Sequence, residues 1–204
     1  MMHKTLLNGL FLLLLTALAP VASAQEVSAQ HTYTILFLGD SLTEGLGLEE
    51  NEAFPSLIAA RLKTEGRSNI KVINGGVSGS TSASALSRLQ WYVRSKPDLM
   101  VLALGANDGL RGLDPNEMKA NLVKTIEFAQ SNGVRVALTG MLSPPNMGPD
   151  YTQTFAQVFP DLAARYDLPF MPFLLEGVAG DPTLNQGDGI HPNPAGAQIV
   201  ADSL

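Results

Sequence analysis

Short apolar runs alternate with longer amphipathic segments over most of the chain. Five runs are predicted to be strands, the last weaker than the others: Thr34–Leu38, Ile70–Ile73, Leu99–Leu104, Val134–Thr139 and the stretch around Pro169–Pro172. Most of them lack the polar alternation of a half-exposed strand. This pattern is typical of parallel strands that are covered on both faces.

The segments between these runs have the periodicity of helices. The predicted helices are Ala53–Thr64, Ala83–Arg94, Pro115–Ser131, Thr152–Arg165 and Pro194–Ser203. The third follows Asp114, which can cap it. Its residues Met118, Leu122 and Ile126 recur every four positions on one face. The alternation predicts a three-layer α/β/α domain with a parallel sheet, in which functional groups gather in loops at the carboxyl ends of the strands.

The first 24 residues have the pattern of a secretory signal peptide. Lys4 gives a basic start, Leu6–Ala19 is largely apolar, and Ala22-Ser23-Ala24 is a small-x-small cleavage site. A retained membrane anchor is the alternative, but spanning a bilayer needs about 20 apolar residues, and this run is shorter. We therefore expect residues 1–24 to be removed and residues 25–204 to form one exported domain, in the periplasm or the medium.

Charge and composition narrow the classes of partner. The 204-residue chain has a net charge of −6, and the predicted cleavage removes Lys4 but no acidic residue. The mature domain is then more acidic still, which disfavours nucleic acid and anionic membrane surfaces as partners. The chain contains no cysteine, so thiol catalysis, lipoprotein anchoring and thiolate metal sites are excluded.

A serine directly follows the first predicted strand, in Gly39-Asp40-Ser41. Gly39 permits a tight turn, which would place Ser41 just beyond the carboxyl end of the strand. The plainer interpretation is that Ser41 caps a following helix. The sequence also departs from the G-x-S-x-G turn of α/β-hydrolases, because Thr43 stands at the second Gly position. Ser41 is therefore a candidate nucleophile only if it has partners.

The histidines supply the first partner. His3 lies in the expected signal peptide and His31 in the leader after it, so His191 is the only histidine within the folded domain. A serine needs a nearby base to act as a nucleophile at neutral pH. His191 lies in the Gly- and Pro-rich segment Gly187–Pro192, a loop that can place Asp188 beside it to orient the imidazole. The alternative is a structural hydrogen bond of His191 beneath the last helix.

Two further loops offer hydrogen-bond donors. The second strand leads into a Gly-rich segment in which Gly79 lets a backbone N–H approach a ligand. The third strand leads into Gly105–Gly109, where Asn107 offers a side-chain amide. Acyl transfer needs donors aimed at the developing oxyanion, and the N–H groups of Ser41 and Gly79 with the Asn107 amide are three candidates. Ordinary turn chemistry explains each loop alone, but their placement after successive strands favours a common site.

These segments resemble the SGNH, or GDSL-type, hydrolase family. The four blocks appear in order: Gly39-Asp40-Ser41, Gly79, Gly105-Ala106-Asn107-Asp108 and Asp188-Gly189-Ile190-His191. The likeness covers nearly the whole of residues 25–204. Gly109–Gly112 and Asp188–Asn193 look especially like the bacterial arylesterase, lysophospholipase and acyl-CoA thioesterase branch. Relatives usually continue past the position of Leu204, where this sequence stops only a few turns after the start of its last predicted helix.

The resemblance implies a flavodoxin-like parallel sheet of five strands and neither a cofactor nor a metal. By the same resemblance, Ser41 is the nucleophile, His191 its base and Asp188 the partner of that base. Ser41, Gly79 and Asn107 match the oxyanion donors of the family. The implied enzyme is a serine esterase, which we expect to be a monomer; the acidic charge and the short apolar run predict neither a nucleic acid partner nor a stable membrane anchor. Its substrate would be a small acyl ester or thioester, or a lysophospholipid.

Three alternatives stay open. A carbohydrate O-acetylesterase uses the same motifs, but Leu110 beside the site, with Leu142 and Met147 expected nearby, favours binding of fatty or aryl acyl groups. A non-catalytic binding protein with a flavodoxin-like cleft is less favoured, because G-x-x-x-x-G-K-[ST] and G-x-G-x-x-G are missing from the strand-to-helix turns. A metal hydrolase is least favoured, because a catalytic zinc usually has three protein ligands including His.

Overall fold

The computed structural model describes residues 31–204, so the predicted signal peptide, residues 1–24, lies outside the described residues. Five parallel strands form one sheet in the order β2-β1-β3-β4-β5. The strands are β1 (Tyr33–Gly39), β2 (Ile70–Gly76), β3 (Leu99–Ala103), β4 (Arg135–Thr139) and β5 (Phe170–Met171). All five predicted strands are confirmed, and the weakest of them, β5, has only two residues.

Seven α-helices occur within residues 31–204: α1 (Ser41–Glu44), α2 (Phe54–Thr64), α3 (Ala85–Tyr92), α4 (Ala106–Leu110), α5 (Pro115–Ser131), α6 (Pro149–Tyr166) and α7 (Pro194–Ser203). The five predicted helices are confirmed, two of them with the predicted bounds. The pattern does not predict α1 and α4, which have four and five residues and are too short to show helical periodicity. None of the described helices has the length and apolar character needed to cross a bilayer.

Three predicted helices differ at their ends, among them α2, which begins at Phe54, one residue after the predicted start. The segment predicted as Ala83–Arg94 is α-helical only in its middle, where α3 lies between 3₁₀ turns at Ser82–Ser84 and Val93–Ser95. Helix α6 begins at Pro149, three residues before the predicted start, directly after Gly148 with its positive φ of 89°. Proline is well suited to the first turn of a helix, because its missing N–H has no intrahelical partner there.

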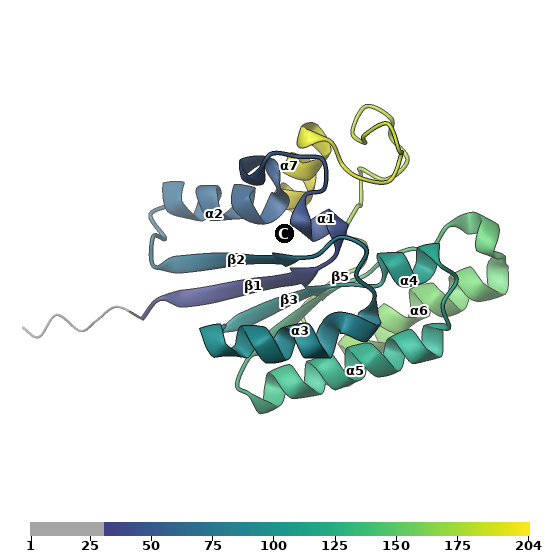
Figure 1. Ribbon diagram of the computed structural model, residues 1–204, viewed down its shortest axis with the longest axis horizontal. Helices are drawn as coiled ribbons and strands as arrows, with labels where there is room; N and C mark the ends of the chain where they lie inside the picture. Colours follow the sequence, from purple (N-terminus) through teal and green to yellow (C-terminus); the bar gives the residue numbers. More distant parts are fainter. Residues whose placement is uncertain (1–30) are drawn as a thin grey trace, which may run out of the picture. The chain divides into compact units, whose positions relative to one another are not determined.

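Helices cover both faces of the sheet (Figure 1). The short α1 lies with α2 and α7 on one face, and α3, α5 and α6 cover the other. The core lies between these layers and includes Met118, Leu122 and Ile126, all almost completely buried. These are the residues whose spacing predicts α5. The predicted three-layer α/β/α architecture is therefore confirmed.

Three strands end level with one another at the carboxyl edge of the sheet. Gly39, the last residue of β1, is in register with Gly76 of β2 and Ala103 of β3. Strand β2 pairs with one edge of β1, and the next strand in the sequence, β3, pairs with the other edge of β1. Open α/β sheets bind ligands at such a reversal of strand order. Because α1 follows β1 and α4 follows β3, their residues meet at this edge.

Two glycines let α1 lie tightly against the strand ends. A Cβ atom on Gly76 would collide with the backbone of Glu44, and a Cβ atom on Gly39 would collide with the side chain of Thr43. Any larger residue at either position would push α1 away from the sheet. The first residue of α1, Ser41, would move with it.

Candidate active site

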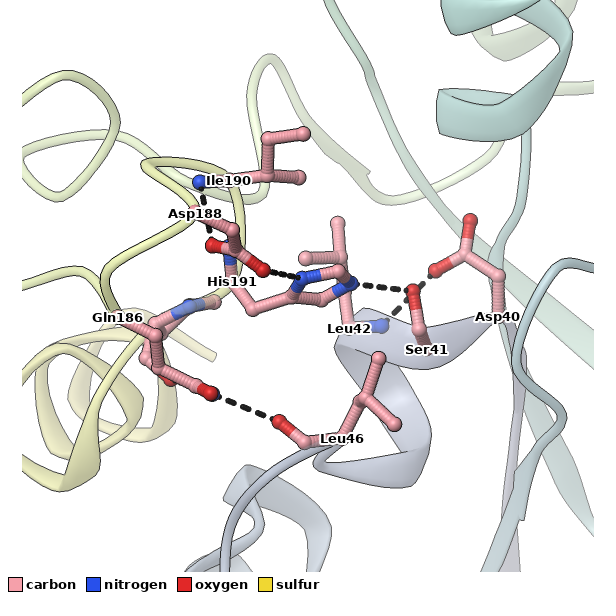
Figure 2. Close-up of polar contacts among 9 residues, drawn as sticks. Asp40, Ser41, Leu42, Leu46, Gln186, Asp188, Ile190 and His191 are labelled. Atoms are coloured by element: carbon pink, nitrogen blue, oxygen red, sulfur yellow. Dashed lines mark hydrogen bonds and ion pairs between the residues drawn. The ribbon is translucent and has the colours of Figure 1, made fainter.

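Ser41, His191 and Asp188 form a line of hydrogen bonds at the carboxyl edge of the sheet (Figure 2). His191 Nε2 lies 2.8 Å from Ser41 Oγ, and His191 Nδ1 lies 2.6 Å from Asp188 Oδ2. Ser41 begins α1, whereas Asp188 and His191 lie in the loop before α7. The fold thus brings together the three residues that the sequence singles out, although 150 positions separate Ser41 from His191.

Asp188 is held as an anion by three hydrogen bonds. Its Oδ1 accepts the backbone N–H groups of Ile190, at 2.9 Å, and His191, at 3.0 Å, while its Oδ2 faces His191 Nδ1. The hydrogen bond from the His191 ring, followed by those from the two backbone groups, lowers the pKa of Asp188 to about 2. An ionised carboxylate only accepts hydrogen bonds. In the neutral ring, His191 Nδ1 therefore carries the proton, and Nε2 presents a lone pair to Ser41.

Ser41 is not the capping residue of α1. Asp40 is the N-cap, and its Oδ1 accepts the N–H of Leu42 at 3.0 Å. Ser41 is the first residue of the helix and is 8% exposed. Its hydroxyl contacts His191 and makes no capping bond. The interpretation of Ser41 as a helix cap is therefore wrong, and its Oγ is available for chemistry.

His191 is the histidine that approaches Ser41. The other described histidine, His31, lies on the surface before β1, where its Nε2 is 2.9 Å from Asp98 Oδ1. The His191 side chain is 16% exposed, so it is partly sheltered from solvent. Within residues 31–204, no three His, Cys, Asp or Glu side chains gather closely enough to hold a metal ion.

Gln186 ties the His191 loop to the segment after α1 (Figure 2). Its Nε2 donates to the carbonyl of Leu46 at 2.7 Å and to the carbonyl of Pro192 at 3.0 Å. Its backbone N–H donates to the carbonyl of His191 at 2.8 Å. These bonds fix His191 relative to Ser41. The sequence does not single out Gln186, because its partner Leu46 is 140 positions away.

Side chains from the end of α1 and from just after α4 fix the Gly79 loop. Glu44, the last residue of α1, accepts the backbone N–H of Ser78 at 2.7 Å and also the Ser78 hydroxyl. Arg111, just after α4, donates to the carbonyl of Gly79 at 2.9 Å. Gly79 has a φ of 75°, a conformation that strongly favours glycine. The peptide that carries the Gly79 N–H is thus held in place from both sides.

The candidate oxyanion donors are the backbone N–H groups of Ser41 and Gly79 and the side-chain amide of Asn107. The backbone N–H groups of Ser41 and Gly79 donate to no group among residues 31–204. Asn107, in α4, donates through Nδ2 to Oδ2 of Asp40, the residue before Ser41, at 3.4 Å. The three donors therefore come from α1, from the loop after β2 and from the helix after β3, as their positions in the sequence predict.

Asp40 is a buried carboxylate that sequence reasoning left without a role. Its relative exposure is 0%, and burial raises its pKa to about 6, although hydrogen bonds from Leu42 and Asn107 act in the opposite direction. Arg88 of α3 lies nearby and donates to the carbonyls of Gly39, at 2.8 Å, and Gly75. Burial lowers the pKa of the Arg88 guanidinium, and the charge of Asp40 counteracts this effect.

Asp108, next to Asn107 in the sequence, has structural contacts. It is buried, and its carboxylate accepts the backbone N–H of Ser82 at 2.9 Å and the Ser82 hydroxyl at 2.6 Å. Ser82 begins the turn that leads into α3. Asp108 therefore anchors α4 to the segment after the Gly79 loop.

An apolar groove of about 510 Å³ opens beside α1 and the loop that carries His191. Its lining includes Leu42 and Ile190, the neighbours of Ser41 and His191, together with Leu110, Leu142 and Phe173. Leu110 is 45% exposed and so presents a large apolar surface to a ligand.

Met147 does not line this groove, although the sequence places it near the acyl site together with Leu142. It lies on the 3₁₀ turn Pro145–Met147, where its methyl group approaches Gly112. Met147 therefore contacts the loop after α4.

Comparisons with known proteins agree with this architecture. Residues 37–199 match the GDSL-like lipase/acylhydrolase family. Esterase TesA from Pseudomonas aeruginosa is 41% identical over 182 residues, which cover 89% of each chain. Thioesterase 1/protease 1/lysophospholipase L1 from Escherichia coli K12 is 34% identical over 194 residues, or 95% of this chain and 86% of the relative. The crystal structure of TesA matches with a TM-score of 0.79 at 39% identity, over 83% of this chain and 94% of the other.

The family match spans all four sequence blocks, from the end of β1 to the loop before α7. The structural match extends the agreement to the five-stranded parallel sheet and its flanking helices. The chain therefore belongs to the GDSL-like lipase/acylhydrolase family and is a carboxylic ester hydrolase.

Proposed function

We propose that this protein hydrolyses acyl esters through a covalent acyl-enzyme on Ser41, with His191 as the general base and Asp188 orienting that base. The observation that carries the proposal is the continuous line of hydrogen bonds from Ser41 Oγ through the His191 ring to Asp188, at 2.8 and 2.6 Å. Both distances lie within the range expected of a nucleophile and its base.

In the first half of the reaction, Ser41 Oγ attacks the carbonyl carbon of the ester while its proton moves to His191 Nε2. The carbonyl oxygen becomes an oxyanion that accepts hydrogen bonds from the N–H groups of Ser41 and Gly79 and from Asn107 Nδ2. His191 then gives the proton to the leaving alcohol, and the acyl group stays on Ser41. The negative charge of Asp188 stabilises the imidazolium that exists between these two steps.

In the second half, a water molecule attacks the acyl-enzyme. His191 takes a proton from this water, the oxyanion forms again, and its collapse returns the proton to Ser41 Oγ. The products are a carboxylic acid and the free enzyme. No redox step occurs, so the residues present account for every proton moved.

The substrate class follows from the groove. Its lining by Leu42, Leu110 and Ile190 suits an apolar acyl or aryl group, because apolar surface gains free energy when it leaves water. Small esters and thioesters are thus the proposed substrates, and the lysophospholipase name of the Escherichia coli relative adds lysophospholipids. Family membership leaves no support for a non-catalytic binding role.

A panel of p-nitrophenyl esters with acyl groups from acetate to palmitate tests the proposal. We expect hydrolysis with kcat/KM rising from acetate to medium chains, because each added methylene buried in the groove contributes about 0.8 kcal/mol. Lysophosphatidylcholine and a palmitoyl thioester extend the panel to the two other substrate classes. Activity confined to acetate, together with release of acetate from acetylated polysaccharide, would instead identify an O-acetylesterase.

Replacement of Leu110 by Ser is expected to impair long-chain esters selectively. The substitution removes an apolar side chain from the groove, so kcat/KM for a long acyl ester should fall by about tenfold or more, with acetate hardly affected. Leu113→Ser is the matched control, because Leu113 is also exposed and lies three positions further on but does not line the groove. An equal loss for all chain lengths would remove Leu110 from the acyl site.

Asp188→Asn is expected to remove part of the acid sensitivity of folding. The pKa of Asp188 is about 2 in the folded protein and about 3.9 in an unfolded chain. Its charge therefore stabilises the fold fully above about pH 5, and this contribution is lost as the pH falls towards 2. The difference in unfolding free energy between wild type and Asp188→Asn, measured by urea titration, should shrink over that range. A constant difference would show that folding leaves this carboxyl group unperturbed.

We further propose that the protein is exported. The basis for export is the signal-peptide pattern of residues 1–24, which lie outside the described residues. Fractionation of cells that express the full chain, followed by mass determination of the purified product, checks both export and cleavage after Ala24. A full-length product retained in the membrane fraction would contradict the proposal.

A further inference from the structure

We propose that the carboxylate of Asp40 is a positioning residue, which holds the side-chain amide of Asn107 in the orientation that stabilises the oxyanion. This inference rests on the proposed function, because it assigns a role in the same reaction. It concerns a residue that neither attacks the substrate nor exchanges a proton with it. In the reaction, Asp40 acts through Asn107.

The first argument is that Asp40 uses its two oxygens for different partners. Oδ1 accepts the N–H of Leu42 and so caps α1, at 3.0 Å. Oδ2 accepts from Asn107 Nδ2 at 3.4 Å. The second bond is long, as catalytic hydrogen bonds often are before substrate binds. One side chain thereby links the helix that begins with Ser41 to the helix that carries Asn107.

The second argument is that capping alone does not explain a buried charge. The other capping aspartate of the fold, Asp114, accepts from Asn116 at 2.8 Å and lies on the surface. Asn and Ser cap helices as well as Asp does, and neither brings a charge into the interior. Asp40 is completely buried, which disfavours its charged form and raises its pKa to about 6. A role that needs an acceptor on both oxygens accounts for a carboxylate at this position.

The third argument comes from the chemistry of an amide. The oxygen and nitrogen of the Asn side chain are nearly equal in size, so shape alone does not decide which way the group faces. An ionised carboxylate accepts hydrogen bonds and donates none, so it selects the orientation in which Nδ2 of Asn107 faces Asp40. The other N–H of Nδ2 has no partner among residues 31–204. Its direction is then fixed and it is available to the oxyanion.

The charges around Asp40 decide when it is ionised. Arg88 of α3 interacts favourably with its negative charge, and so does His191 from the loop before α7 when that ring is protonated. Glu44, at the other end of α1, also interacts with Arg88. At neutral pH the carboxylate is mainly ionised. Protonation near pH 6 places a hydrogen on one of two oxygens that both already accept an N–H, so one of these contacts is lost.

Asp40→Asn separates the two roles. An Asn at this position still accepts the Leu42 N–H and keeps the cap, but it turns an amide NH₂ group towards the NH₂ group of Asn107. Two donors cannot bond to each other, so the Asn107 amide is expected to rotate away from its productive orientation. With p-nitrophenyl acetate, kcat should fall by about tenfold or more with KM nearly unchanged, the loss expected for one hydrogen bond to a charged group.

Asp98→Asn is the matched control. Like Asp40, Asp98 is a carboxylate that accepts a backbone N–H, in this case that of Thr34 at 2.7 Å. Thr34 lies near the start of β1, at the end of the strand opposite to Asp40. We expect normal kcat in this variant. Circular dichroism and thermal unfolding of both variants establish that kcat is measured on folded protein.

A double-mutant cycle with Asn107→Ala gives the decisive measurement. If Asp40 acts through Asn107, Asp40→Asn causes little further loss of kcat in the Asn107→Ala background. A merely structural defect would lower kcat by the same factor in both backgrounds, and this outcome would overturn the inference. Normal kcat in folded Asp40→Asn would overturn it equally.

The acid limb of the pH profile provides a second readout. In the wild type, protonation of Asp40, whose pKa is about 6, should lower kcat/KM on the acid side in addition to protonation of the base. Asp40→Asn should lack the first of these effects, so its acid limb should be less steep than that of the wild type. An unchanged slope would contradict the inference. Labelling of Ser41 by a fluorophosphonate in the wild type, measured in parallel, tests the proposed function separately.

Discussion

Ser41→Ala is expected to abolish ester hydrolysis and to leave the fold intact. Without Oγ no acyl-enzyme forms, so kcat should fall by roughly 10⁶-fold, as when other serine hydrolases lose the nucleophile. The structure predicts a small effect on stability, because Asp40 and not Ser41 caps α1. The lost bond to His191 would change the unfolding free energy by about 1 kcal/mol. Hydrolysis of p-nitrophenyl butyrate and thermal unfolding measure the two effects.

Covalent labelling identifies the nucleophile directly. A fluorophosphonate should modify Ser41 in the wild type and nothing in Ser41→Ala, as located by mass spectrometry of the peptides. Ser87→Ala is the control, because Ser87 is exposed on α3 and bonds only to the carbonyl of Ser84. Labelling of a different serine, with Ser41 unmodified, would remove Ser41 from the mechanism.

The sheet and the long helices are predictable because burial leaves a regular trace in the sequence. Strands covered on both faces must be apolar throughout, and α5 must repeat apolar residues to face the core. Ser41, Asp188 and His191 are also accessible to sequence reasoning. Among residues 25–204, His191 is the sole histidine apart from His31, and Asp188 lies three residues before it. Scarcity of candidates makes that pairing secure.

The supporting contacts of the site leave no such trace. Glu44, Gln186 and Arg111 are charged or polar residues of kinds that are common on any surface. Their partners are the loop at Ser78, the carbonyl of Leu46 and the carbonyl of Gly79. Each contact joins segments that are far apart in the sequence and adjacent only once the sheet has formed.

The short helices α1 and α4 escape prediction for a related reason. A helix of four or five residues cannot be stable alone, so it exists because neighbouring structure holds it. For α1 this structure is the Asp40 cap and the close approach that Gly39 and Gly76 permit. For α4 it includes the bonds of Asp108 to Ser82. Sequence periodicity reports neither.

Asn107→Ala is expected to lower kcat by roughly 10²- to 10³-fold with KM nearly unchanged, the usual cost of losing one oxyanion donor. The physical reason is that a hydrogen bond to the carbonyl oxygen strengthens as negative charge develops on it. It therefore stabilises the transition state more than the bound ester. Steady-state kinetics with p-nitrophenyl butyrate, analysed separately for kcat and KM, measure this difference.

Asp108→Asn distinguishes catalysis from turn stability at the same helix. Asp108 bonds to the N–H and hydroxyl of Ser82, and its replacement should lower the melting temperature while kcat stays nearly normal. Asn107→Ala should show the opposite pattern, because its side chain makes a single long bond to Asp40, and such a bond contributes about 1 kcal/mol to stability. A near-normal kcat in folded Asn107→Ala would leave only the backbone N–H groups of Ser41 and Gly79 to stabilise the oxyanion.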